Sequence, residues 1–280
     1  MTEIAARLAL AIDIAQEAGQ LARQMRSRQS GDFVSAKGPQ DFVTEADTAV
    51  EYLLHRRLAA AYPEDGFLGE EGGSRTRGRF TWVVDPIDGT TNFLRGLPEW
   101  GVSIACMSAE HIELGVIYLP DLNRLGWCSR AEGAYLDGIA LDLSNRPESA
   151  GKLAILGHSD RLLLEDHLRT ISGLLPAGYE YRRQGAACFG LLAVAAGWAD
   201  FYFEGHLNPW DAMAGLLLVE TAGGQVSRPA LPQFLRAGGA VLASSGDLAP
   251  EILDRLQPPP PASDTARRHP DQGGDLPSEG

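Results

Sequence analysis

The sequence is poor in basic residues and has no long apolar run. Its 280 residues include 24 Lys and Arg against 37 Asp and Glu, which gives a formal net charge of −13 at pH 7. Binding to nucleic acid or to an anionic membrane requires a basic face, so the composition argues against both as partners. The most apolar stretch, residues 186–203, contains Asp200, and a buried helix followed by a strand explains it better than a membrane span.

Cysteine is scarce as well. Cys106, Cys128 and Cys188 are odd in number and form no C-x-x-C pair, so we expect free, buried thiols in a reducing compartment. Near the start of the chain, Glu3 stands in place of the basic cluster of a secretion signal, and Asp13 interrupts the first apolar run. We therefore expect a cytoplasmic protein.

The acidic residues gather after apolar runs, most clearly in residues 80–93. Residues 80–84 are β-branched and aromatic, which predicts a buried strand. Asp85 comes at its expected end, where Pro86 should stop the pairing, and Asp88 follows one short turn later. Gly89 then opens a predicted helix with small residues. Carboxylates beside a helix N-terminus can hold hard cations, and the free amides can hold an anion, most simply a phosphate.

Each acidic position also has an ordinary structural interpretation. Asp-Pro and Asp-Gly are common turn pairs. Glu70 follows a short apolar strand, and Asp211 lies in the first turn of a predicted helix, where an acid usually caps or complements the dipole. Thr44 and Asp47 likewise have capping-box spacing. The metal hypothesis rests on the number of such positions, because any one of them would be weak.

Periodicity predicts a single domain over residues 1–256, with a subdomain seam near residues 144–151. Two amphipathic helices, residues 4–25 and 50–61, flank a polar stretch at 30–40 that we expect to be a loop. Successive strands between residues 101 and 141 predict an antiparallel sheet, with a hairpin turn at Asp137-Gly138. After the seam, strands alternate with helices, which indicates mixed α/β layers. Residues 257–280 begin with four prolines and predict a disordered tail.

The motifs together resemble the inositol monophosphatase family. The resemblance lies in residues 85–92 (D-P-I-D-G-T-T-N), in Gly69-Glu70-Glu71 upstream, and in Trp210-Asp211-Ala212 with Gly223-Gly224 downstream. It implies an α/β fold of alternating αβαβα layers, with an antiparallel-rich first sheet and a mixed second sheet. It also implies a magnesium-dependent, lithium-sensitive phosphatase that forms a homodimer.

The ligands that the resemblance implies are all oxygen atoms, which suits Mg²⁺, with Mn²⁺ as a substitute. Glu70, Asp85 and the carbonyl of Ile87 would hold one ion. Asp85, Asp88 and Asp211 would hold a second, and a third, weaker ion would bind near Glu70 and Asp47. No histidine or cysteine cluster with zinc-ligand spacing competes.

The same resemblance implies the catalytic and substrate-binding roles. Glu70 and Thr90 would orient the attacking water, and Asp47 would orient Thr90. The phosphate would meet the Gly89 and Thr90 amides and Lys37. Residues implied to contact the sugar or inositol ring are Gly185, Ala186, Ala187 and Glu204.

Several alternatives stay open on sequence. Hydrolysis of a small polyol phosphate, most simply myo-inositol 1-phosphate, is the favoured function. His158 stands where the inositol phosphatases carry serine, so a histidinol-phosphate phosphatase is the runner-up. Glu204 itself could be a solvated acid at a strand end. A third hypothesis is a non-catalytic regulatory protein on the same fold, binding for instance to transcription machinery.

Overall fold

The computed structural model describes residues 2–28, 34–38, 41–75, 78–146 and 151–256, with backbone alone for 34–38, 41–44, 74 and 75. The predicted tail at 257–280 and the ends of the predicted loop at 30–40 lie outside these residues. The helices are α1 (Glu3–Ser27), α2 (Glu45–Ala61), α3 (Thr90–Arg95), α4 (Leu164–Leu174), α5 (Ala187–Ala195), α6 (Pro209–Thr221), α7 (Leu231–Ala237) and α8 (Pro250–Leu253). A short 3-10 helix spans Leu143–Asn145.

The strands form two large sheets and one hairpin. The hairpin pairs β1 (Val34–Gly38) with β2 (Asp41–Thr44). The eight-stranded sheet contains β3 (Gly66–Gly69), β4 (Gly73–Arg75), β5 (Thr81–Asp88), β6 (Gly101–Met107), β7 (Ile112–Leu119), β8 (Arg124–Ser129), β9 (Gly133–Leu136) and β10 (Ile139–Ala140). The five-stranded sheet contains β11 (Lys152–Leu156), β12 (Tyr179–Arg182), β13 (Phe201–Leu207), β14 (Gln225–Ser227) and β15 (Gly239–Ser244).

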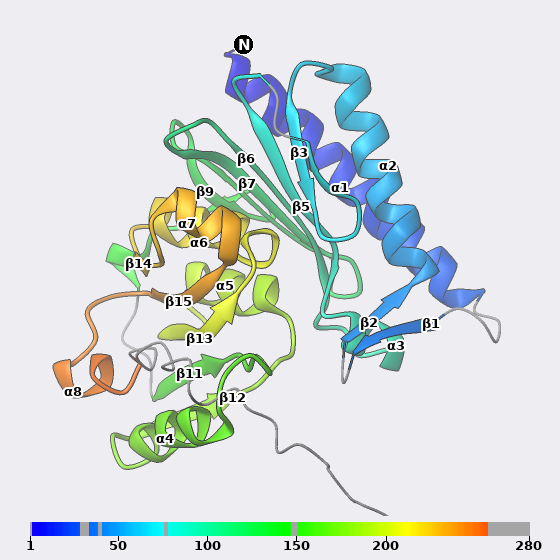
Figure 1. Cartoon of the computed structure of the whole chain (residues 1–280). Helices are drawn as coiled ribbons and strands as arrows, with labels where there is room; N and C mark the ends of the chain where they lie inside the picture. Colours follow the sequence, from blue (N-terminus) through cyan, green and yellow to red (C-terminus); the bar gives the residue numbers. More distant parts are fainter. Residues whose placement is uncertain (1, 29–33, 39–40, 76–77, 147–150, 257–280) are drawn as a thin grey trace, which may run out of the picture.

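The elements stack as five layers, helix–sheet–helix–sheet–helix (Figure 1). Both faces of the eight-stranded sheet are buried, and alternate residues of β5 serve them: Trp82 and Val84 pack toward α1 and α2, and Val83 toward α5 and α6. The five-stranded sheet covers the other side of α5 and α6 and carries α4 and α8 on its far face. The predicted αβαβα architecture is confirmed.

Strand directions follow the prediction too. In the eight-stranded sheet only β3 and β5 pair in parallel, and the other neighbours are antiparallel. In the five-stranded sheet β11 pairs in parallel with β12 and β13, and β15 pairs antiparallel with β13 and β14. The Asp137-Gly138 turn joins β9 to β10 with positive φ at both residues, as a tight primed hairpin turn requires.

Three sequence-based expectations were wrong. The polar stretch at 30–40 contains β1, part of a hairpin and not a plain loop. β5 does not end at Asp85 but continues to Asp88 through an irregular step. β13 likewise runs past Glu204 to Leu207 through a register shift. In both long strands local bulges let pairing resume, and composition gives no signal for that.

The three cysteines, Cys106, Cys128 and Cys188, are free and buried, as predicted. Among the described residues, no helix combines the length and the apolar character that crossing a membrane requires.

Helix α6 lies between the two large sheets, and nearly all of its sides are buried. Residues 212–219 are buried without a break, as expected for a helix between two sheets. It approaches β7 so closely that a Cβ at Gly115 would lie 2.7 Å from the carbonyl oxygen of Ala214. The position of Asp211, at the start of α6, therefore depends on this backbone contact.

Gly115→Ala should destabilise the protein by about 1–3 kcal/mol, because the added methyl group overpacks a helix–sheet contact. Gly246→Ala is the matched control, since a Cβ there meets no atom within 4 Å. Urea unfolding of both variants measures the difference. Equal stability of the two variants would show that α6 can move away from β7 at no cost.

Candidate functional site

The site begins at the irregular end of β5. Asp85 pairs with Ser103 of β6 and Asp88 pairs with Gly101, so the intervening Pro86-Ile87 step falls out of register. Pro86 has no N–H to donate, and the amide of Ile87 turns to the Asp85 carboxylate, with 3.0 Å between N and Oδ1. Two carboxylates thereby leave one strand end within four residues. Asp85 is 2% exposed.

Asp88 is held by the N-terminus of α5. Its carboxylate accepts a hydrogen bond from the amide of Cys188, and the amide of Ala187 also favours its charged form. An acid at this end of a helix is stabilised by the dipole and by unpaired amides. The sequence predicted that Gly185, Ala186 and Ala187 approach the substrate. In the structure, the amides of Ala187 and Cys188 support the Asp88 carboxylate.

Asp211 and Thr90 reach the same region from other elements. Asp211 lies in the first turn of α6, as predicted, where its Oδ2 accepts a hydrogen bond from the amide of the N-cap residue Asn208 at 2.9 Å. Thr90, at the start of α3, lies 3.2 Å from the carbonyl oxygen of Ile87 and 3.5 Å from Oδ1 of Asp47, the limit of a hydrogen bond. Asp47 is buried at the start of α2. The starts of three separate helices and a strand end therefore meet here.

The electrostatics of the cluster are dominated by burial and by like charge. Burial raises the pKa of Asp85 well above its usual value, and the strongest charged neighbours, Glu70, Asp88, Asp211 and Asp47, raise it further. Burial likewise raises the pKa of Asp211 to about 7, with Asp88 adding to the effect. The pKa of Asp88 is also raised by burial, although hydrogen bonds from Cys188 oppose the shift. Such a cluster strongly favours any positive charge that enters it.

The carboxylates are too far apart to form a complete set of ligands around one metal ion. In the described part of the chain, no group of three or more His, Cys, Asp or Glu side chains is close enough together to hold a metal ion. The donor chemistry, oxygen throughout and buried, nevertheless suits a hard divalent cation.

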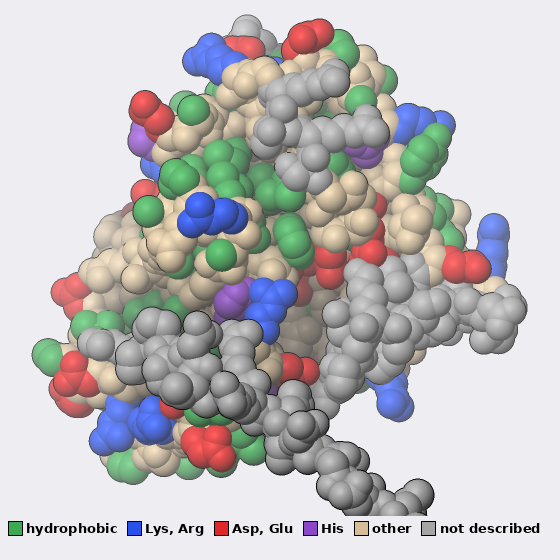
Figure 2. Space-filling model, viewed as in Figure 1, with side chains coloured by type: hydrophobic (Ala, Val, Ile, Leu, Met, Phe, Trp, Pro, Cys, Tyr) green, Lys and Arg blue, Asp and Glu red, His purple; other side chains and the backbone are tan. Residues whose placement is uncertain are grey.

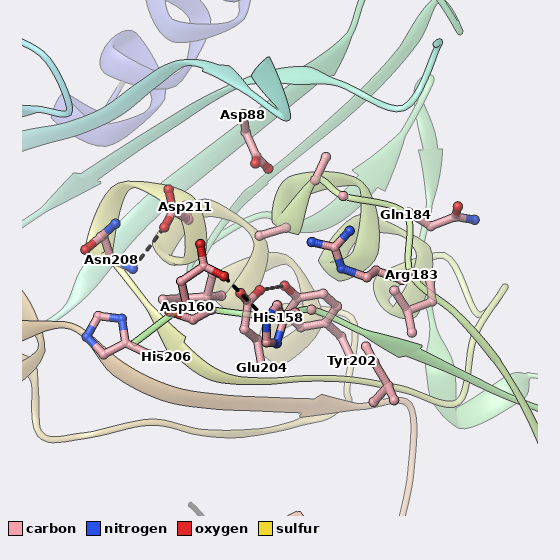
Figure 3. Close-up of a pocket in the computed structure, with 18 of the residues that line it drawn as sticks. Asp88, His158, Asp160, Arg183, Gln184, Tyr202, Glu204, His206, Asn208 and Asp211 are labelled. Atoms are coloured by element: carbon pink, nitrogen blue, oxygen red, sulfur yellow. Dashed lines mark hydrogen bonds and ion pairs between the residues drawn. The ribbon is translucent and has the colours of Figure 1, made fainter. Parts of the chain in front are cut away.

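Glu70, Asp88 and Asp211 line a cavity of about 340 Å³ between the layers. Figure 2 shows acidic side chains in a hollow of this face, with basic and histidine side chains on the opposite rim. In the close-up, Asp88 enters from the β5 side, and Asp211, Tyr202 and Glu204 lie across from it (Figure 3). Other lining residues are the turn Gly157-His158-Ser159, Arg161, Arg183, Gly185, Ala186, Ala187 and His206.

Seven of the predicted site residues line the cavity: Glu70, Asp88, Asp211, Gly185, Ala186, Ala187 and Glu204. Gly89 adopts a left-handed conformation, with φ 87°, and a Cβ there would lie 2.9 Å from Ala186 Cβ. The side chain of Lys37 lies outside the described residues. Glu204 is only 8% exposed, so its interpretation as a solvated strand-end acid was wrong.

Sequence reasoning missed four residues that shape the site. Tyr202 donates a hydrogen bond to Glu204, and its place two residues earlier on the same strand could have shown this. Asn92 ties α3 to the chain before α5, because its Nδ2 lies 2.6 Å from the carbonyl oxygens of both Glu99 and Gln184. Gly157 and Cys188 act through backbone position, for which side-chain patterns carry no signal. His158 lies in the cavity wall, 3.4 Å from Asp160.

The layered fold and the acidic cleft together define a class of α/β proteins, and comparisons with known proteins identify the family. The inositol monophosphatase family profile matches residues 4–258, and the chain belongs to that family. "Inositol-1-monophosphatase" of Caulobacter vibrioides is 37% identical over 240 residues, covering 80% of this chain and 90% of that protein. "Nus factor SuhB" of Xylella fastidiosa is 40% identical over 195 residues, covering 69% and 71%.

Solved structures agree with this assignment. The extragenic suppressor protein SuhB from Bartonella henselae superposes with a TM-score of 0.81 at 31% identity, over 90% of this chain and 98% of that one. An inositol monophosphatase from Thermotoga maritima superposes with a TM-score of 0.78 at 27% identity, over 89% and 96%. The fold and the family are thus shown, and relatives of this chain carry either the name inositol monophosphatase or the name SuhB.

The metal-free protein should lose stability as pH rises from about 4 to 8. Asp211 and Glu204 have folded pKa values near 7 and 8, above ordinary values of 3.8 and 4.5, so the folded state binds more protons in that window. In EDTA we expect Tm to fall by roughly 5–10 °C between pH 5 and 8. Asp211→Asn should flatten this slope, whereas exposed Asp254→Asn should keep it. A wild-type Tm that rises with pH would contradict the interpretation.

Proposed function

We propose that the protein is a magnesium-dependent phosphomonoesterase acting on a small polyol phosphate, most simply myo-inositol 1-phosphate. The observation that supports it best is the clustering of Glu70, Asp88 and Asp211, which line the cavity, around the buried Asp85, with no positive neighbour among the strongest influences on Asp85. A phosphate ester cannot approach such a cluster unless cations are bound there first.

The residues proposed to hold the ions are those that the motifs indicate. Glu70, Asp85 and the carbonyl of Ile87 would take one, Asp85, Asp88 and Asp211 a second, and the region of Glu70 and Asp47 a third, weaker one. Bound Mg²⁺, or Mn²⁺ in its place, would offset the carboxylate charge, attract the phosphate, acidify a water molecule and stabilise the leaving oxygen.

The protein's own side chains would orient the attacking water. The Thr90 hydroxyl carries one proton, which it can donate to Asp47 or to the carbonyl of Ile87. Its lone pairs are then free to accept a hydrogen bond from water, while the Glu70 carboxylate accepts a proton from the same molecule. The amides of Gly89 and Thr90, with Lys37, would contact the phosphate, and Glu204 with residues 185–187 the polyol.

Two alternative functions each have an observation in their favour. Histidinol phosphate is the second substrate candidate, because His158 lies in the cavity wall and Glu204 could also meet an amine. A binding protein without catalysis is favoured by one specific observation, the name Nus factor that several relatives carry. A homodimer and inhibition by lithium are part of the main proposal.

Phosphate release separates these functions. The full chain should hydrolyse myo-inositol 1-phosphate with Mg²⁺ and not with EDTA, and faster than histidinol phosphate, fructose 1,6-bisphosphate or adenosine 3′,5′-bisphosphate. Preference for histidinol phosphate would select the second candidate. No release from any of the four with Mg²⁺ or Mn²⁺ would select the binding protein.

Asp88→Asn should lower kcat by about 10³-fold or more while the fold persists, because one charge that holds a cation is removed. Asparagine retains an oxygen for the Cys188 amide, so the α5 contact survives. Mg²⁺ should raise the Tm of wild type but not of the variant, since a ligand stabilises only the protein that binds it. Exposed Asp254→Asn serves as control. Wild-type turnover by a folded Asp88→Asn protein would remove Asp88 from the proposed ligands.

Glu204→Ala should act on the substrate and not on the ions. Loss of one hydrogen bond to a polyol hydroxyl should raise KM by about 10-fold or more, with a smaller change in kcat. An aryl phosphate offers no hydroxyl to Glu204, so its kinetics should change little. Steady-state kinetics on both substrates measure the split. Equal losses of kcat on the two, at constant KM, would assign Glu204 to the metal site or to the fold.

A further inference from the structure

Glu204 does not stand alone in the cavity wall. Tyr202 and Glu204 are two residues apart on β13, so their side chains leave the same face of the strand. Tyr202 is 2% exposed and Glu204 is 8% exposed. The Tyr202 hydroxyl donates a hydrogen bond to Oε2 of Glu204 at 2.5 Å (Figure 3).

Gly157 closes the other side of this pair. Its amide donates to the carbonyl oxygen of Phe203 at 2.9 Å, which fixes the end of β11 beside β13. A Cβ at Gly157 would lie 1.9 Å from Oε2 of Glu204 and 2.7 Å from the Tyr202 hydroxyl oxygen. Any side chain at this position would therefore displace the carboxylate. Glycine is required here for space, since its φ is not in the positive range.

The second carboxylate oxygen of Glu204 has a different environment. Among the described residues, Tyr202 makes the one side-chain hydrogen bond to Glu204, through Oε2. Burial raises the pKa of Glu204 to about 8, the Tyr202 hydrogen bond opposes that rise, and Asp211 and Asp88 add to it. Burial also raises the pKa of Tyr202, so its hydroxyl keeps its proton and remains a donor. Oε1 is left for a ligand in the cavity that Glu204 lines.

We propose that Tyr202 and Gly157 are positioning residues: they hold Glu204 in one orientation, with Oε1 presented to a hydroxyl group of a polyol phosphate. The inference rests on the proposed function and adds to it the two residues that make Glu204 a hydroxyl receptor. With Tyr202 bonded to Oε2, Oε1 is the oxygen left for a ligand, and a neutral hydroxyl group loses less hydration energy than an ammonium group on entering this buried site.

Tyr202→Phe tests the first residue, because it removes the hydroxyl and little else. We expect KM for myo-inositol 1-phosphate to rise about 5- to 30-fold with kcat within about twofold. The rise for p-nitrophenyl phosphate should be far smaller. Gly157→Ala should shift KM in the same direction by moving the carboxylate directly. Tyr179→Phe is the matched control, since Tyr179 is a buried tyrosine on the same sheet that packs on Phe201 away from the cavity.

A double-mutant cycle with Glu204→Ala, which removes every acceptor that Tyr202 could hold, separates positioning from a general structural effect. If Tyr202 acts through Glu204, adding Tyr202→Phe to Glu204→Ala should raise KM no further. If the two substitutions instead acted independently, so that KM of the double variant rose by the product of the two single effects, the inference would be overturned. So would an unchanged KM in Tyr202→Phe, or equal losses on the polyol and aryl substrates.

Calorimetric titration with myo-inositol 1-phosphate in Mg²⁺ distinguishes failure of the inference from failure of the proposed function. If wild type binds the compound without turnover, the proposed function fails, and weaker binding by Tyr202→Phe but not Tyr179→Phe still supports the inference. Equal affinity in all three proteins, or no binding by wild type, overturns it.

Discussion

Buried negative charge at the end of β5 is the constraint on which the rest of the site depends. Asp85, Asp88 and Asp211 share a region from which water is largely excluded, where Asp88 and Asp211 disfavour the ionised form of Asp85 and Asp88 disfavours that of Asp211. Charge in such an environment persists only with compensation. The N-terminus of α5 and the amide of Ile87 supply part of it through directed hydrogen bonds. The remainder would come from cations.

The two ends of the cavity are formed by different sheets. Asp85 and Asp88 come from the eight-stranded sheet, and Tyr202 and Glu204 come from the five-stranded sheet across the α5–α6 layer. Asp211 belongs to α6, whose place against β7 depends on the absence of a side chain at Gly115. The strand residues proposed to bind the metal ions and the strand residue proposed to bind the polyol therefore lie on separate sheets.

Much of this could be predicted because the signals are local. The Asp85 to Asn92 run, the helix start at Asp211 and the Asp137-Gly138 turn are short patterns with direct structural meaning, and the elements they predict are present. The extension of β5 to Asp88 could not be foreseen, since pairing resumes opposite Gly101 of β6, a residue outside the local motif. Gly157 and Asn92 act across residues distant in sequence, so no spacing rule reveals them. Tyr202 was predictable from strand periodicity and was missed.

The most direct test of a cation-binding carboxylate cluster is a crystal structure of the full chain with Mn²⁺, measured for anomalous scattering. We expect difference peaks between Glu70, Asp85 and the Ile87 carbonyl, and between Asp85, Asp88 and Asp211, with the carboxylates drawn together around them. An occupied Mn²⁺ site elsewhere, with these carboxylates unligated at saturating metal, would contradict the assignment.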